Sequence, residues 1–104
     1  MAKITLNEMQ REVQGRRLFE GNSVFSRITD NLYVVYSYGY HFPMYVYDYA
    51  IGKWIGNSDK YSTTTSRHQS KCNPNDVEFW LDTDELKHMI GKGGFVEYKL
   101  REDV

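Results

Sequence analysis

A polar segment in the second half of the chain has the residue types that an anion-binding site requires. Residues 61–72 carry a dense group of hydroxyl side chains at their start and two cations, Arg67 and Lys71, further along. If a helix begins near Thr65, both cations lie on one face, where they could meet a phosphate or a carboxylate. The candidate binding residues are therefore Lys60, Tyr61, Thr64, Thr65, Ser66, Arg67, His68 and Lys71. Alternatively, the hydroxyls only cap the helix, and His68 is a hydrogen-bonding residue of the fold.

The same segment lacks the spacing that catalysis or metal binding requires. Ser66 and Ser70 each lie two residues from His68, on different faces of a helix, so no nucleophile and base pair is indicated. Cys72 and the three histidines show no CxxC or HxxxH spacing, and no phosphate-binding loop occurs. The sequence therefore favours a non-enzymatic role, without a metal or a cofactor.

Tyrosine is the most unusual feature of the composition. Aromatic residues make up 15% of the chain, and seven of the nine tyrosines fall between residues 33 and 49. In an extended strand over residues 44–49, Tyr45, Tyr47 and Tyr49 share one face. A helix could partly cover this face. If it is open, it could bind a protein through large side chains of low entropy cost, or stack unpaired bases.

The net charge is −1. This value excludes the strong positive charge of a dedicated DNA-binding protein and the strong negative charge of a DNA mimic. The charges are nevertheless segregated along the chain. Residues 53–75 contain four basic residues and one acidic residue, whereas residues 76–85 contain five acidic residues and no basic one. These segments could be solvated surface loops, or an anion-facing patch beside a repulsive wall that orients a partner.

Runs of β-branched and aromatic residues predict the strands that must position these side chains. The predicted strands form a meander over residues 24–29, 32–38, 44–49 and 53–57, because the intervening turns are short enough to join antiparallel neighbours. A further extended piece covers residues 77–81. A final strand over residues 95–100 follows two glycines.

Capping signals predict the helices. A capping box and apolar residues at helical spacing predict a first helix over residues 6–14. The N-cap of a second, short helix is one of Thr64, Thr65 and Ser66. A second capping box predicts a third helix that starts at Asp82 and ends at Gly91.

Length and composition predict a single domain over residues 1–104. Its class is α+β, with one antiparallel sheet of about four to five strands and two to three short helices on one side. No apolar run approaches the roughly 20 residues of a membrane helix, and the first residues do not open a signal peptide. With one cysteine, Cys72, no internal disulfide can form. We therefore expect a protein of the cytoplasm.

Three short elements of the sequence form a recognisable signature. Residues 36–39 read Tyr-Ser-Tyr-Gly, Trp54 follows, and residues 60–70 read Lys-Tyr-Ser-Thr-Thr-Thr-Ser-Arg-His-Gln-Ser. In these elements the chain resembles a family of small uncharacterised proteins encoded by bacteriophages, prophages and plasmids, with the signature SYxT, an aromatic residue and KYSxTTSxHQ. The resemblance covers about residues 31–75, and residues 38–43 depart from it, where the family has a shorter turn. It implies a mobile-element protein that acts inside a bacterium, and it implies no activity.

These observations leave three functions open. The first is a non-enzymatic accessory protein of a phage or mobile element that binds a host macromolecule, for example to inhibit a defence system such as CRISPR. The second is a nucleic-acid-binding module that combines tyrosine stacking with the basic Thr/Ser/Arg/His segment. The third is a binder of a small anionic ligand, or an enzyme, at residues 64–68.

The expected partner is a host protein, and nucleic acid is the alternative. No membrane contact is expected, and the expected location is the cytoplasm of the host bacterium. Exposed strand edges could also pair two copies into a homodimer.

Overall fold

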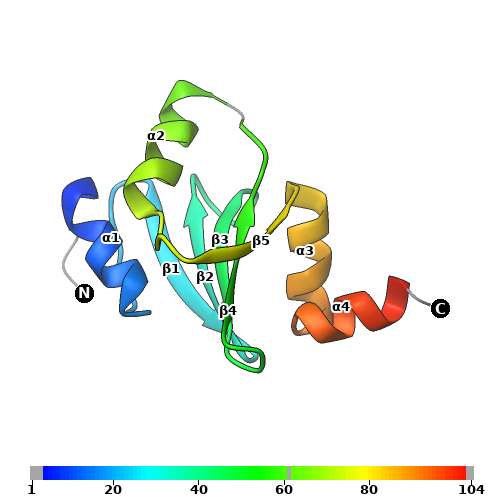
Figure 1. Cartoon of the computed structure of the whole chain (residues 1–104). Helices are drawn as coiled ribbons and strands as arrows, with labels where there is room; N and C mark the ends of the chain where they lie inside the picture. The colour runs from blue at the N-terminus through cyan, green and yellow to red at the C-terminus, as the bar shows by residue number, and fades with distance from the viewer. Residues whose placement is uncertain (1–3, 61, 103–104) are drawn as a thin grey trace.

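The computed structural model describes residues 4–60 and 62–102, so the candidate residue Tyr61 lies outside the described residues. The elements are α1 (Leu6–Gln14), β1 (Val24–Thr29), β2 (Leu32–Ser37), β3 (Pro43–Asp48), β4 (Lys53–Asn57), α2 (Thr63–Cys72), β5 (Val77–Leu81), α3 (Thr83–Lys92) and α4 (Phe95–Glu102). The sheet lies at the centre, with α1 and α2 on one side of it and α3 and α4 on the other (Figure 1). This arrangement confirms the predicted α+β class.

The five strands form one sheet in the order β1-β2-β3-β4-β5. The first four are antiparallel neighbours, which confirms the predicted meander. β5 instead runs parallel to β4, because α2 carries the chain back along the sheet before β5 begins. The sheet is therefore mixed rather than purely antiparallel, and its fifth strand is Val77–Leu81.

The predicted C-terminal strand over residues 95–100 is wrong, because these residues lie in α4. Gly93 ends α3 with a left-handed φ of 90°, which turns the chain between the two helices. The carboxylate of Asp48, at the end of β3, accepts a hydrogen bond from the N–H of Phe95 (2.8 Å) and so caps the new helix. Phe95 and Tyr98, three residues apart, then pack on the sheet side of α4. These contacts outweigh the β propensity of the segment.

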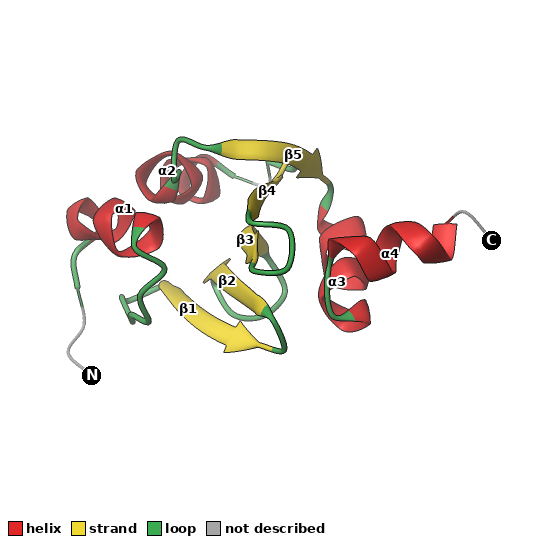
Figure 2. Ribbon diagram, turned by 60° about the horizontal axis from the view of Figure 1, so that its bottom comes forward, coloured by secondary structure: helices red, strands yellow, loops and turns green. Residues whose placement is uncertain are grey.

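Helices cover both faces of the sheet, and the expectation of helices on one side is wrong (Figure 2). α1 and α2 pack on the face that carries Tyr33 and Tyr45, whereas α3 and α4 pack on the face that carries Leu32 and Val34. β2 is buried along its whole length. This two-sided burial explains why β2 and β3 show apolar residues at successive positions rather than an alternation with polar ones.

Two of the helix starts are those that the capping signals predict. Thr5 and Glu8 form the capping box of α1, which spans the predicted residues, and Asp82 and Glu85 form the capping box of α3. α3 continues past Gly91 to Lys92, because the left-handed cap follows at the next residue. No helix within the described residues is long and apolar enough to cross a membrane.

Candidate functional site

The hydroxyl groups at the start of α2 organise the end of that helix. Ser62 is the N-cap, and its side chain accepts a hydrogen bond from the N–H of Thr65 (3.1 Å). The same hydroxyl is 3.1 Å from Oγ1 of Thr65. The predicted N-caps, Thr64, Thr65 and Ser66, are wrong because the helix already begins at Thr63. Part of the hydrogen-bonding capacity that an anion would use here is therefore occupied by the cap.

His68 links α2 to the end of β2. The side chain is 8% exposed, and its Nδ1 lies 2.7 Å from the hydroxyl of Ser37. The ring of Tyr38 lies 5.3 Å from the imidazole, between centroids. Burial, and to a lesser degree the charge of Arg67, lower the pKa of His68, so the imidazole is neutral at pH 7. Ser37 and His68 belong to different signature elements, and the fold brings these elements together.

Gln69 ties α2 to the loop that follows β4. Its side-chain amide donates to the carbonyl oxygens of Asn57 (3.1 Å) and Asp59 (3.0 Å), and its Oε1 accepts from Lys60 (3.4 Å). The main-chain carbonyl of Gln69 accepts a hydrogen bond from the hydroxyl of Tyr45 (2.6 Å). Burial raises the pKa of Tyr45, so this hydroxyl remains a donor. Gln69 is not among the predicted binding residues, and its bonds connect α2 with β3 and with the loop after β4.

The exposed side of α2 carries the remaining candidates. Thr64 and Arg67 are exposed, and Ser66 is half-buried. Lys71 donates from its Nζ to the side-chain carbonyl of Asn7 (3.2 Å), which joins α2 to α1. Among the described residues, none forms an ion pair or a hydrogen bond with the guanidinium of Arg67. Arg67 is therefore the candidate cation that the fold leaves available to a partner.

The three tyrosines of the predicted aromatic face differ in their exposure. Tyr45 is buried, whereas Tyr47 is half-buried beneath the guanidinium of Arg16, which lies 4.3 Å from the ring centroid. Tyr49 is 41% exposed, and its ring meets that of Tyr47 edge-to-face at 5.1 Å. These residues therefore do not form a continuous open platform, and Tyr49 is the member with the largest exposed surface.

The sequence prediction missed the loop between β2 and β3, residues 38–42, which we call the tyrosine loop. Tyr38 is 55% exposed and Tyr40 is 60% exposed. Tyr38 contacts His68 on the α2 side of the sheet, whereas Tyr40 meets the ring of Tyr36 edge-to-face at 4.9 Å on the other side. The loop thus presents one large aromatic side chain over each face at this end of the sheet.

Tyr38 has a strained backbone. Its φ is 57°, in the left-handed region, which costs a non-glycine residue about 1–2 kcal/mol. Its N–H donates to the carbonyl oxygen of Ser23 (2.7 Å), and Gly39 continues the turn with a φ of 93°. One signal in the sequence could have identified this turn: a glycine between two tyrosines.

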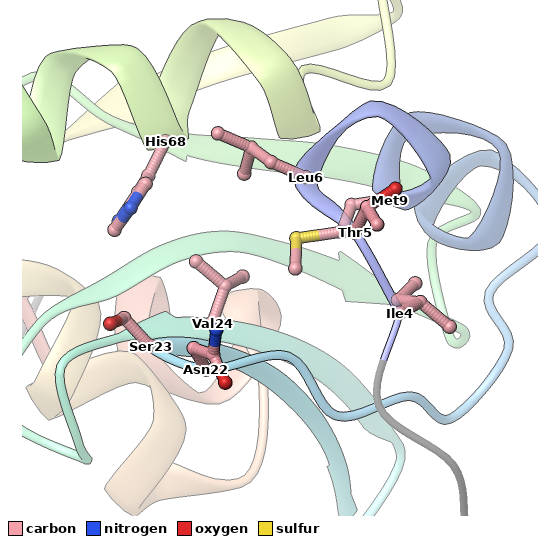
Figure 3. Close-up of a pocket in the computed structure, with 8 residues that line it drawn as sticks. All are labelled: Ile4, Thr5, Leu6, Met9, Asn22, Ser23, Val24 and His68. Carbon is pink, nitrogen blue, oxygen red and sulfur yellow. The ribbon is translucent and has the colours of Figure 1, made fainter.

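A pocket of about 290 Å³ lies beside His68, between α1, α2 and the residues that lead into β1 (Figure 3). Its apolar lining consists of Ile4, Leu6, Met9 and Val24, and its polar lining consists of Thr5, Asn22, Ser23 and His68. Tyr38 does not line the pocket, but it contacts two of the lining residues: its ring meets His68, and its N–H bonds to the carbonyl oxygen of Ser23. The volume is at the lower end of the range for ligand sites, so it suits a single side chain or a small group better than a cofactor.

Within the described residues, the surroundings of His68 lack the complete set of groups of a serine–histidine–carboxylate triad. Ser37 is buried, and no carboxylate in the described part of the chain contacts His68 to orient its ring. Burial raises the pKa of the Cys72 thiol to about 12, so this thiol is not a nucleophile at neutral pH. Within the described ranges, no three His, Cys, Asp or Glu side chains are grouped closely enough to hold a metal ion.

Comparison of the chain with protein-family models, with curated proteins and with solved structures found no match. The function must therefore be inferred from the contacts and the exposure of its own side chains. The residues that carry this inference are Tyr38, Tyr40, Arg67 and His68.

Proposed function

We propose that the chain is a small accessory protein of a phage or another mobile element, and that it binds a host protein without catalysing a reaction. Its contact surface consists of the tyrosine loop, Arg67 and the pocket beside His68. The observation that carries the proposal is Tyr38, whose large aromatic side chain is 55% exposed and whose backbone is in the left-handed conformation.

The conformation of Tyr38 costs stability, and most of its ring is still in solvent. A glycine would adopt the same φ without strain. Strained residues persist where surrounding contacts fix them, and they cluster at functional sites. Here the hydrogen bond to Ser23 and the ring contact with His68 fix the tyrosine. Tyrosine and arginine contribute strongly to protein interfaces, and the ring of Tyr38 contacts His68, which follows the exposed Arg67 in α2; both side chains fit a docking role.

The pocket offers a place for one side chain of the partner. Leu6 and Val24 give it an apolar wall, whereas Asn22 and Ser23 provide polar atoms at its edge. A side chain with an apolar body and a polar end matches this lining. Tyr38 contacts His68, one of the lining residues, so the pocket and the tyrosine loop can belong to one contact surface.

The resemblance over residues 31–75 supports an origin in a mobile element and a role inside a bacterium. A domain of this size can offer one interface of about 800 Å² per partner, which is enough for a stable complex. Blocking a functional surface of the partner requires no catalytic residue. An inhibitor of a host defence system, such as CRISPR, falls within this proposal.

The test is a pull-down with tagged protein from bacterial lysate, with and without nuclease, washed at low and at high salt. Mass spectrometry identifies the retained proteins, and ultraviolet absorbance detects nucleic acid. We expect one protein to be retained stoichiometrically through nuclease and high salt, because a tyrosine-rich interface depends little on phosphate contacts. Recovery of nucleic acid alone, lost at high salt, would instead support the nucleic-acid-binding alternative and contradict the proposal.

Matched variants assign the contact to the tyrosine loop. The double variant Tyr38→Ala/Tyr40→Ala should lose the retained protein, whereas Tyr49→Ala should keep it. Tyr49 is also exposed but follows the opposite end of β3, so it controls for the loss of any exposed ring. If the double variant retains the same protein as the wild type, the contact lies elsewhere and the proposed surface is wrong.

A further inference from the structure

β5 forms an open edge of the sheet, on the far side from β1. It pairs with β4 on one side, and among the described residues no strand pairs with its other side. An edge strand presents unpaired N–H and C=O groups to which another extended chain can add. The three central residues of β5 are exposed, so solvent reaches their side chains.

Two aromatic side chains flank the backbone of this edge. Phe79 is 37% exposed and stacks on Phe95 of α4, with ring centroids 4.7 Å apart. Trp80 is 51% exposed and lies over Gly56 on the opposite face, where a Cβ atom would come within 2.6 Å of its ring. Gly56 is therefore required for this position of Trp80. The edge thus offers an apolar surface on both faces of the sheet.

The edge is also acidic. Asp76 and Glu78 are exposed on or next to β5, and the segment 76–85 contains no basic residue. The Oε1 atom of Glu78 is 3.7 Å from Nζ of Lys53, but both side chains are about half exposed, so this ion pair is weak. An incoming basic side chain can therefore interact with these carboxylates.

From these features we infer a second docking site: the outer edge of β5 binds an extended segment of a partner protein in which basic and apolar side chains alternate. The backbone of the segment adds to the sheet as a sixth strand next to β5. Its apolar side chains lie on one face and contact Phe79, and its basic side chains lie on the other face, beside Trp80 and within reach of the exposed carboxylates of Asp76 and Glu78. This edge is separate from the tyrosine loop, so each site can fail without the other.

A second copy of the chain fits this edge less well. Pairing two β5 edges would place Asp76 and Glu78 of both copies on one short ladder. Like charges close together across strands destabilise the pairing. The acidic side chains therefore act against self-association while they attract a basic segment.

The site is tested with a short blocked peptide of alternating lysine and valine, titrated into the isotope-labelled protein and followed by amide NMR shifts. We expect the shifted resonances to cluster on Val77–Leu81. A peptide of alternating glutamate and valine should bind much more weakly. A lysine–valine peptide that is N-methylated on one edge should lose binding, because it cannot donate to the strand.

Charge-reversal variants show whether the acidic side chains of the β5 edge are responsible for peptide binding. Glu78→Lys should weaken binding of the lysine–valine peptide by about fivefold to tenfold. Glu97→Lys, the same change at an exposed position of α4, should alter it by less than about twofold. Equal binding of the acidic peptide, shifts away from β5, or self-association through Val77–Leu81 without peptide would each overturn the inference.

Discussion

The two layers of helices that cover the sheet differ in where polar side chains bond them to the strands. In the α1/α2 layer, polar side chains connect helix and sheet: the hydroxyl of Tyr45 donates to the carbonyl oxygen of Gln69, and Ser37 bonds His68. In the α3/α4 layer, apolar side chains such as Leu86 are fully buried, and the polar bonds to the strands are at the helix starts, between Asp48 and Phe95 and between Asn57 and Thr83. Of the exposed tyrosines of the proposed docking surface, Tyr38 contacts His68 in the α1/α2 layer, whereas Tyr40 contacts Tyr36 on the other face.

The difference shows which contacts fix position and which mainly supply stability. A hydrogen bond requires one donor and one acceptor at about 3 Å, so it holds a helix in one place. Apolar packing depends on volume and tolerates exchanges among residues of similar size. The bonds of Ser37 to His68 and of Tyr45 to Gln69 therefore fix the position of α2 on the sheet. The proposed docking surface depends on their geometry.

Leu86→Ala should cause the largest loss of stability. The side chain of Leu86 is completely buried between α3 and the sheet, and truncating such a residue costs about 2–5 kcal/mol of the free energy of unfolding. The melting temperature should fall by roughly 10 °C or more. Below that temperature, retention of the host protein in a pull-down should be unchanged. Loss of retention in folded Leu86→Ala would show that the apolar layer also positions the docking surface.

Gln69→Ala should lower the free energy of unfolding by less than Leu86→Ala does, but it should loosen α2, which carries Arg67 and His68. Removing the amide leaves the carbonyl oxygens of Asn57 and Asp59 without this donor, which costs about 1–3 kcal/mol. Hydrogen exchange of the amides in α2 should become faster, while that of α3 stays as in the wild type. Gln10→Ala, which removes one side-chain bond to the carbonyl oxygen of Asn73, is the milder control. Uniform acceleration across both helices would contradict a separate α1/α2 layer.

The smallest effect should be the dependence of the free energy of unfolding on pH that the titration of His68 causes. Its pKa is lowered in the folded protein, so between that value and about 6.5 the unfolded chain binds the proton more readily. The free energy of unfolding should therefore fall as the pH falls through this range. Thermal melts between about pH 7.5 and pH 5 should show a smaller decrease for His68→Gln than for the wild type. His88→Gln, at an exposed position of α3, should behave as the wild type does.

Local sequence rules predicted the elements whose stabilising contacts are close in the chain. The hairpin of β1 and β2 follows from two residues between β-branched runs, and the capping boxes of α1 and α3 each involve residues three apart. α4 could not be predicted in this way, because its first N–H bonds to Asp48, which is 47 residues earlier in the chain. The parallel pairing of β5 likewise depends on the path of α2.

The site was predictable only in part for the same reason. A structural role for His68 was one of two interpretations of the polar segment, but its partner Ser37 is 31 residues away. The exposure of Tyr38 depends on a left-handed turn that a tyrosine rarely adopts. A tyrosine at this position therefore does not predict the turn. Tyr45, in contrast, is buried because α2 covers it, and a period-two pattern does not reveal which face is covered.

The most direct test of the central claim is the behaviour of Tyr38→Gly. Glycine adopts a φ of 57° without strain, so the melting temperature should change by only a few degrees despite the loss of the ring contact with His68. Retention of the host protein in the nuclease-treated, high-salt pull-down should nevertheless be lost. If Tyr38→Gly retains that protein as the wild type does, Tyr38 is not a docking residue and the proposed function is contradicted.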